Sequence, residues 1–429
     1  MLTIYIFAVL IGLLVINVPV VMAIGLTAVV FFVGLGDGFL LAMLPQRMYY
    51  GTTGFTLLAI PFFIFAGNLM NVGGITERIF RFAKALVGHV PGGLGQVNIV
   101  ASVIFSGMSG SAVADAAGLG QIEHKAMVDD GYDPAVSATL VAASSIIGPV
   151  IPPSIPFVLY GAITSVSVAR LFMAGFIPGI ILSAGLMTSL AVLAIRRGYP
   201  RSPHRAPFSD MLESFLGAFW PLMAPVIIIG GIMTGFFTPT EASVVVCVYA
   251  IFLGFLYRNL AWRDLPDIIW QSIRQSASLL FIMAAANFFG WFIIHQRVPD
   301  SIIEALVGGG ATQSSVLWII IGIVLIMGCF LEGNAIFLIT LPIFIPIVNM
   351  FNIDLINFGV VMTLLIMIGN LTPPVGMCLF AVDSFAHVGI TNLSKQVWPY
   401  LIVIFLVTVL IAFVPEIALF LPNLLDGVR

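Results

Sequence analysis

The feature that most constrains the fold is a series of long apolar stretches that follow one another along almost the whole chain. Of the 429 residues, 60% are hydrophobic and only 8% are charged, whereas roughly 25% of residues are charged in a typical soluble domain. A helix of about 20 apolar residues crosses the hydrocarbon core of a bilayer. The chain is therefore predicted to be an all-α polytopic membrane protein, because the runs are too long for the strands of a membrane barrel.

Ten of these stretches are interpreted as membrane spans. They cover residues 3–17, 19–35, 55–72, 135–163, 167–195, 213–235, 238–256, 267–295, 355–383 and 396–420. Two further apolar stretches, 93–122 and 314–350, are interrupted near the centre by SGMSGSAVAD and CFLEGNAIF. Each arm has only about 15 residues, too few to cross alone. Both stretches are predicted to be re-entrant hairpins, whose tips must be covered by protein or line a water-filled cavity.

The arginines of the longest polar loop predict the orientation in the membrane. The loop from Arg196 to Asp210 contains Arg196, Arg197, Arg201 and Arg205. Short loops rich in Lys and Arg remain cytoplasmic. Counting spans outward from this loop places both termini on the outer side. The segment 76–86 has an amphipathic period and is predicted to lie along the membrane interface.

Proline and glycine break two of the predicted spans at matching places. The stretch IGPVIPPSIPF (147–157) shares the pattern I-G-x-x-x-P-P with IGNLTPPVGMC (368–378), which begins 221 residues later. The centres of the two hairpins align at an offset of 223, and Pro19 aligns with Pro239 at an offset of 220. Three markers in the same order predict an internal repeat, with chance similarity of apolar sequence as the alternative.

The predicted repeats cover residues 1–200 and 206–429, and each holds five spans and one hairpin. Because five is odd, the second repeat is predicted to be inverted relative to the first. Inverted repeats with broken helices are a common architecture of secondary transporters. A broken helix exposes carbonyl and amide groups that have no partner within the helix, and these groups can hold a cation or an anion. The alternative is that the prolines only kink the spans for packing.

The chain resembles the large membrane subunit of the tripartite ATP-independent periplasmic (TRAP) transporters over essentially its whole length. The most specific stretches are FSGMSGSAVADAAGLG (105–120), GYDPAVSATLVAASSIIGPVIPPSI (131–155), GNAIFLITLPIFIPI (333–347) and GNLTPPVG (369–376). The resemblance implies a Na⁺-coupled, elevator-type importer of organic acids in a bacterial inner membrane. It also implies a small membrane subunit and a soluble periplasmic binding protein as partners. The chain as a whole looks most similar to the sialic-acid branch.

Candidate Na⁺ ligands are predicted at the two hairpin tips and the two breaks. Hydroxyls and freed carbonyls are hard oxygen ligands, by analogy with the sites of other hard cations. The predicted ligands are Ser106, Ser109, Ser111 and Gly148 in the first half, and Gly333, Asn334, Gly369 and Thr372 in the second. Each serine could instead be a small residue that lets helices pack closely, and Asn334 could form an interhelical hydrogen bond.

The predicted substrate contacts are Ser111, Asp115, Pro153, Ser154, Pro373 and Pro374. A buried acid in a membrane is costly and is a functional candidate, and three acids lie near the tips: Asp115, Glu332 and Asp383. Asp115 is favoured, with capping of the second arm of the hairpin as its alternative role. The two hairpins and broken spans are predicted to form a mobile unit that slides against the remaining spans.

Other classes of protein fit the sequence less well. A C4-dicarboxylate TRAP transporter and a stand-alone Na⁺/dicarboxylate carrier remain the nearest alternatives. A channel is disfavoured because there is no ring-forming filter motif. An enzyme is disfavoured because there is no GxSxG, HExxH or paired-carboxylate motif. The five histidines and three cysteines show no metal-ligand spacing, and no basic stretch could grip nucleic acid.

Overall fold

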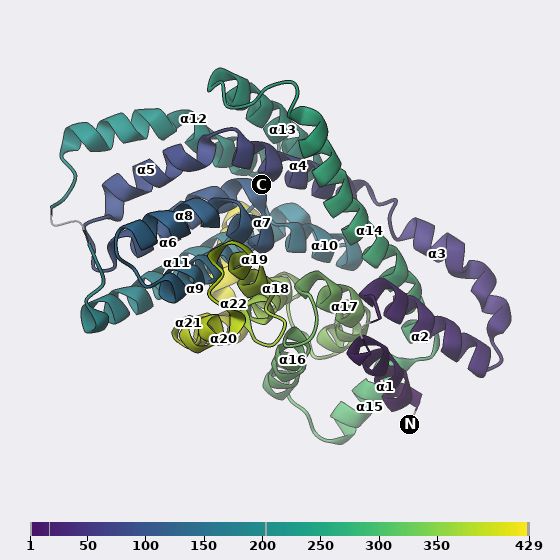
Figure 1. Ribbon diagram of the computed structural model, residues 1–429. Coiled ribbons are helices and arrows are strands. Elements are labelled where there is room, and N and C mark those ends of the chain that lie inside the picture. The colour runs from purple at the N-terminus through teal and green to yellow at the C-terminus, as the bar shows by residue number, and fades with distance from the viewer. Residues whose placement is uncertain (1, 17, 202–203, 427–429) are drawn as a thin grey trace.

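The computed structural model describes residues 2–16, 18–201 and 204–426, and these residues form twenty-two α-helices and two short 3₁₀ helices, with no strand among them (Figure 1). Six described helices are long and apolar enough to cross a membrane, or seven if α20 and α21 are counted as one bent span. Together with the apolar composition, this establishes an all-helical polytopic architecture of the membrane type.

The helices pack as two groups. The first group has α14 near its centre, packed against α2, α3 and α4, while α13 packs against α4 and α12. In Figure 1, α14 runs diagonally from α13 toward α2. This group consists of α1 (Leu2–Val15), α2 (Val20–Gly34), η1 (Gly38–Met43), α3 (Leu44–Tyr50), η2 (Phe55–Leu58), α4 (Ala59–Val72), α5 (Ile75–Val87), α12 (Phe208–Met233), α13 (Pro239–Leu256), α14 (Leu265–His295) and α15 (Val298–Gly308).

The second group interleaves the two halves of the sequence. Helix α19 packs against α7 and α9, and α11 packs against α18, α21 and α22. This group consists of α6 (Gly93–Ser109), α7 (Ala112–Ala117), α8 (Leu119–Asp129), α9 (Pro134–Ser145), α10 (Ile155–Thr164), α11 (Val168–Arg197), α16 (Gln313–Gly328), α17 (Gly333–Met350), α18 (Leu355–Leu371), α19 (Met377–Ala386), α20 (Ile390–Gln396), α21 (Trp398–Phe413) and α22 (Pro415–Asp426).

Two aspartates begin corresponding helices of the two halves. The Oδ1 atom of Asp133 accepts hydrogen bonds from the first free amides of α9, at 2.8 and 3.2 Å. Asp354, 221 residues later, does the same for α18, at 2.8 and 2.9 Å. An N-cap of this kind stabilises a helix by about 1 kcal/mol, because it satisfies amides that have no intrahelical partner. The start of both broken spans is therefore encoded locally.

Most helices lie within a few residues of the ranges expected from the sequence, but three expectations were wrong. The first hairpin does not end at residue 122, because α8 continues to Asp129. Helix α17 has 18 residues and is itself long enough to cross a membrane, so its arm is not too short. The span expected at 396–420 is interrupted: α21 ends at Phe413 and α22 begins at Pro415, where proline cannot continue the preceding helix.

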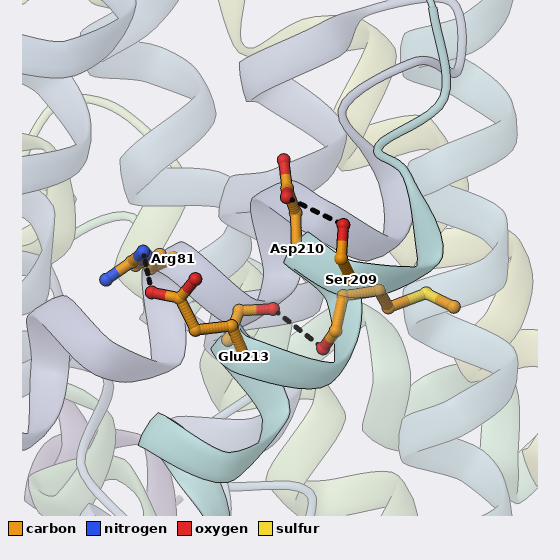
Figure 2. A network of polar contacts seen from close by, with 6 residues as sticks. Arg81, Ser209, Asp210 and Glu213 are labelled. Atoms are coloured by element: carbon orange, nitrogen blue, oxygen red, sulfur yellow. Dashed lines mark hydrogen bonds and ion pairs between the residues drawn. The ribbon is translucent and has the colours of Figure 1, made fainter.

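The amphipathic helix α5 lies side by side with α12 (Figure 1). It buries Ile75, Ile79 and Ala83 on one face. On its other face, Arg81 pairs with Glu213 of α12 at 2.8 Å, close to Ser209 and Asp210 (Figure 2). Both partners are about 70% exposed, so the pair contributes less than about 1 kcal/mol. The buried apolar face therefore holds α5 in place more than the ion pair does.

Two glycines allow the second hairpin to approach the second broken span. A Cβ atom at Gly328, the last residue of α16, would lie 2.8 Å from the Cα atom of Gly369 on α18. Backbone atoms at this point cannot give way as a flexible side chain could. Small residues of this kind are what allow membrane helices to pack backbone against backbone.

We expect Gly328→Ala to push α16 and α18 apart and to destabilise the fold by about 1–3 kcal/mol, the usual cost of overpacking. Thermal unfolding of the purified protein measures the effect. Gly322→Ala is the matched control, since it lies on the same helix and a Cβ there meets nothing within 4 Å. Equal melting temperatures for the two variants would contradict the close approach.

Candidate functional site

The tip of the first hairpin lies against the first helix break. The chain turns between α6 and α7 at Gly110, whose φ of 64° is in the left-handed region. The carbonyl oxygen of Gly110 accepts a hydrogen bond from the amide of Ile155 at 3.4 Å. A Cβ at Gly110 would lie 2.7 Å from the carbonyl oxygen of Pro153, so only glycine fits here. The predicted hairpin tip and the predicted break are thereby in direct contact through residues 45 positions apart in the sequence.

Asp115 is the buried acid at this contact. It is 3% exposed, and its Oδ1 atom accepts a hydrogen bond from the hydroxyl of Ser109. The hydroxyl oxygen of Ser109 in turn accepts from the amide of Ser111 at 3.3 Å. The Oδ2 atom has no hydrogen-bond partner and faces Gly148, where a Cβ would lie 2.3 Å away. The structure therefore brings together Ser109, Ser111, Asp115 and Gly148, all of which were expected at the site.

The N-cap of α7 is Ser111, which accepts from the amide of Ala114, and not Asp115. The alternative role of Asp115 as a helix cap is therefore wrong. The carboxylate of Asp115 points toward the break instead of toward the amides of its own helix. An acid in this position is available to a ligand in a way that a capping acid is not.

The remaining predicted residues of the first half are less directly placed. The hydroxyl of Ser106 is buried and donates to the carbonyl of Val103 on its own helix, at 2.6 Å. Ser154 is the N-cap of α10, accepting from the amide of Phe157 and donating to the carbonyl of Pro149. Pro153 follows a cis peptide bond and presents its carbonyl to the hairpin tip. These side chains stabilise the break itself.

The second hairpin tip meets the second break in a similar way. The carbonyl of Cys329, at the end of α16, accepts a hydrogen bond from the amide of Val375 at 3.3 Å. Glu332 is the N-cap of α17, and its carboxylate also accepts a hydrogen bond from the side-chain amide of Asn334 at 2.6 Å. Thr372 donates its hydroxyl to the carbonyl of Ile368 at 2.7 Å. Pro373 and Pro374 are joined by a cis peptide bond, and Pro374 is exposed.

The two breaks differ in their access. Every residue from Ser144 to Ser154 is buried, whereas Pro374 at the second break is exposed and its neighbours are partly buried.

Asp383, the third acidic candidate, lies farther along α19, where it accepts from the amides of Val388 and Gly389 at 3.0 and 2.7 Å. Asp383 therefore ends a helix and does not join the tips.

Sequence reasoning missed Asn370. Its Oδ1 atom is buried without a hydrogen-bond partner, and it lies 3.3 Å from the position that a Cβ at Gly333 would occupy. It therefore faces the start of α17 as Asp115 faces Gly148. In the sequence, the signal for Asn370 is its place within the stretch GNLTPPVG. That its side chain faces the start of α17 is decided by the tertiary structure.

A second missed feature is a buried pair at the base of the first hairpin. Glu123 on α8 is 1% exposed, and its carboxylate accepts a hydrogen bond from the side-chain amide of Asn98 on α6. The other oxygen of each side chain, Glu123 Oε1 and Asn98 Oδ1, has no hydrogen-bond partner. The pair joins the two arms of the hairpin. It could be suspected from sequence only after the hairpin register was known.

Buried oxygens without donors define what the site can do. A buried polar group left without a partner is costly. Asp115 Oδ2 and Asn370 Oδ1 are such groups, and both lie where a hairpin tip meets a helix break. Carboxylate, amide and carbonyl oxygens together are the donor set of hard monovalent and divalent cations. The hairpin tips and helix breaks therefore bring together oxygens of the types that hard cations prefer.

Two solved structures share this fold. The YdaH transporter of Alcanivorax borkumensis aligns with a TM-score of 0.64 at 14% identity, covering 89% of each chain. MtrF of Neisseria gonorrhoeae aligns with a TM-score of 0.53 at 15% identity, covering 88% of this chain and 84% of that one. At such low identity the likeness shows a common fold only.

Sequence relatives are considerably closer. The sialic acid TRAP transporter permease SiaT of Haemophilus influenzae is 45% identical over 89% of this chain. The large permease SiaM of Vibrio cholerae is 42% identical over 89% of this chain and 90% of its own length. The C4-dicarboxylate large permease DctM of Rhodobacter capsulatus is 36% identical over 98% of both chains. The alignment with SiaT covers 62% of that longer protein.

The profile of the DctM component of tripartite ATP-independent periplasmic transporters matches residues 7–417. This chain belongs to that family. It is a multi-pass permease of the inner membrane and not an enzyme.

We expect Gly148→Ala to reduce solute uptake about tenfold, a change of about 1.4 kcal/mol, because the new methyl group would displace the carboxylate of Asp115. Uptake into proteoliposomes and thermal unfolding are measured together, so that loss of transport is separated from loss of fold. Gly217→Ala on α12, where a Cβ meets nothing within 4 Å, is the control. Unchanged uptake by Gly148→Ala would show that the position of Asp115 is unimportant.

Proposed function

We propose that this chain is the large transport subunit of a Na⁺-coupled importer of an organic acid anion, with sialic acid as the favoured substrate. The observation that carries the proposal is membership of the DctM family together with the order of identities. The two relatives named for sialic acid are 45% and 42% identical, and the relative from Rhodobacter capsulatus named for C4-dicarboxylates is 36% identical. A C4-dicarboxylate is the second candidate substrate, since that relative aligns over 98% of this chain.

The proposed partners are a small membrane subunit and a soluble periplasmic binding protein that delivers the substrate. The tripartite description of the family supports both. A stand-alone carrier is the competing arrangement.

An inverted repeat is supported by details that recur at constant spacing. Asp133 and Asp354 lie 221 residues apart and cap the helices that lead into the two breaks. The hydrogen bond from Ile155 to Gly110 corresponds to that from Val375 to Cys329. The segment from α6 to α10 is thus proposed to correspond to the segment from α16 to α19, with α7 and α8 together taking the place of α17. Two such halves around one centre are typical of secondary transporters.

The first proposed Na⁺ site lies between Asp115 and the first break. Asp115 Oδ2 supplies a charged oxygen without a competing donor, and Ser109, Ser111 and Gly148 lie next to it. Ser106 is proposed to contribute through the backbone of α6, since its hydroxyl is already bonded to Val103. Na⁺ at this position would satisfy the orphaned oxygen and neutralise the buried charge.

The second proposed Na⁺ site lies between α17 and the second break. Asn370 Oδ1 is the side-chain oxygen that lacks a donor there, and Gly333 is next to it. Gly369 and Thr372 would contribute backbone oxygens at the end of α18, and Asn334 lies at the first turn of α17.

An organic anion is proposed to bind between the two cations, close to Ser111, Ser154 and the prolines Pro153, Pro373 and Pro374. An anion next to two cations gains affinity only when both are bound, which couples the sites reciprocally.

Alternating access is proposed to occur by sliding of the second helix group against the first. The two groups meet chiefly where α5 and α4 pack against α6 and where α14 packs against α17. Both hairpins and both breaks belong to the second group, so a rigid movement of that group would carry the site as one unit. The first group, built around α14, would remain as the scaffold.

The test of coupling is uptake of radiolabelled N-acetylneuraminate into proteoliposomes that contain this chain and its small partner, with the binding protein outside. We expect uptake with an inward Na⁺ gradient and only background uptake when K⁺ replaces Na⁺ or the binding protein is omitted. Uptake without the binding protein would favour a stand-alone carrier. Uptake of a C4-dicarboxylate but not of N-acetylneuraminate would replace the substrate and keep the mechanism.

The sliding movement is tested by crosslinking α14 to α17. The test variant lacks Cys247, Cys329 and Cys378 and carries Met283→Cys and Leu338→Cys, whose side chains line one cavity. We expect a cleavable thiol crosslink between the two new cysteines to abolish uptake until the linker is cleaved. The control variant keeps Cys247 on α13, lacks only Cys329 and Cys378, and joins Cys247 to Phe62→Cys on α4, a helix of the same group. Full uptake by the α14–α17 crosslinked protein would refute the movement.

A further inference from the structure

A cavity of about 360 Å³ lies between α14 and α17 and is bounded at one side by α3. This volume is within the roughly 300–1,000 Å³ of ligand pockets. Its walls are almost entirely apolar, with side chains such as Met283, Ile294, Leu338 and Ile345. The polar side chains that reach it are Arg47 on α3 and Asn287 on α14, together with the indole of Trp291. None of these residues belongs to the proposed transport site.

Arg47 is a cation without a counter-charge. Its guanidinium carbon lies 5.0 Å from the centre of the Trp291 ring. Its Nε atom is buried and has no hydrogen-bond partner, and no carboxylate pairs with Arg47 in the part of the chain that the structure describes. A cation that lies over an aromatic ring and lines an otherwise apolar cavity is suited to receive an anion.

The position of Arg47 indicates the level of the lipid headgroups. Tyr49 and Tyr50 on the same short helix are 66% and 63% exposed, and exposed tyrosines gather at membrane–water interfaces. Arginine at that level keeps its charged end toward the headgroups while its stem lies along apolar surface. The apolar cavity beside it lies next to α14 and α17, two helices long enough to cross the membrane. The arrangement is therefore a cation at headgroup level with an apolar chamber beside it.

We propose that this cavity binds one phospholipid of the phosphatidylglycerol type, with its phosphate on Arg47 and an acyl chain between α14 and α17. The lining contains no carboxylate that could receive the ammonium group of a zwitterionic headgroup, so an anionic lipid is favoured. A polyhydroxylated organic acid fits poorly, because Arg47, Asn287 and Trp291 are the only side-chain donors on the walls. Such a ligand would lose most of its hydrogen bonds to water.

The first test measures lipid retained by the purified protein. The protein is equilibrated in mixed vesicles of phosphatidylglycerol and phosphatidylcholine, extracted into detergent, and analysed by native mass spectrometry. We expect one retained phosphatidylglycerol per wild-type chain and at least tenfold less retention by Arg47→Gln. Arg297→Gln is the matched control, an exposed cation just beyond the end of α14 that does not line the cavity.

The second test places the acyl chain. Phosphatidylglycerol with brominated acyl chains should quench a component of the tryptophan fluorescence that is absent in Trp291→Phe and lost in Arg47→Gln. Equal quenching by brominated phosphatidylcholine, unaffected by Arg47→Gln, would overturn the proposal in favour of ordinary surrounding lipid. Displacement of the quencher by N-acetylneuraminate would overturn it in favour of an organic-acid site. Neither measurement depends on uptake, so failure here is distinguishable from failure of the proposed function.

Discussion

The need to satisfy backbone polar groups at two interrupted helices is the constraint on which the rest of the structure depends. A membrane offers no water to these groups, so protein must cover them. Each break receives a hairpin tip from its own half: Ile155 donates to Gly110, and Val375 donates to Cys329. Ser154 further satisfies both the carbonyl of Pro149 and the amide of Phe157. The hairpins are therefore required wherever the breaks occur, and the site forms where they meet.

The same constraint explains why the site is rich in oxygen acceptors. Interrupted helices leave carbonyls that cannot be paired within the helix, and the side chains that face them add further acceptors. Asp115 and Asn370 each keep one oxygen without a donor. A bound cation would be coordinated by these acceptors. In the proposed mechanism, Na⁺ binding and closure of the hairpin tip onto the break therefore occur together. The anionic substrate binds after the cations in that mechanism.

The interleaving of the two halves has a mechanical consequence. Helix α19 of the second half packs against α7 and α9 of the first, and the hydroxyl of Tyr160 on α10 donates to the carbonyl of Leu355 at 2.6 Å. A movement of one hairpin relative to the other would break these contacts. In the proposed mechanism the second helix group therefore moves as a whole, along a boundary with α14 that is partly lined by the cavity at Arg47. A bound lipid would lie at that boundary.

Sequence alone determined the membrane class, the places where both hairpin stretches and both broken spans are interrupted, and the resemblance to the family, because apolar length, proline and glycine act locally. It also identified Ser109, Ser111, Asp115 and Gly148, which the structure brings together. Only the tertiary structure revealed Asn370, the pair of Glu123 with Asn98, the division into two helix groups and the cavity at Arg47. These features depend on which faces of distant helices meet, and in a chain that is apolar on nearly every face, periodicity carries little information about partners. The extension of α8 to Asp129 was likewise decided by packing, whereas the interruption at Val414 has a local cause, since Pro415 cannot continue the preceding helix.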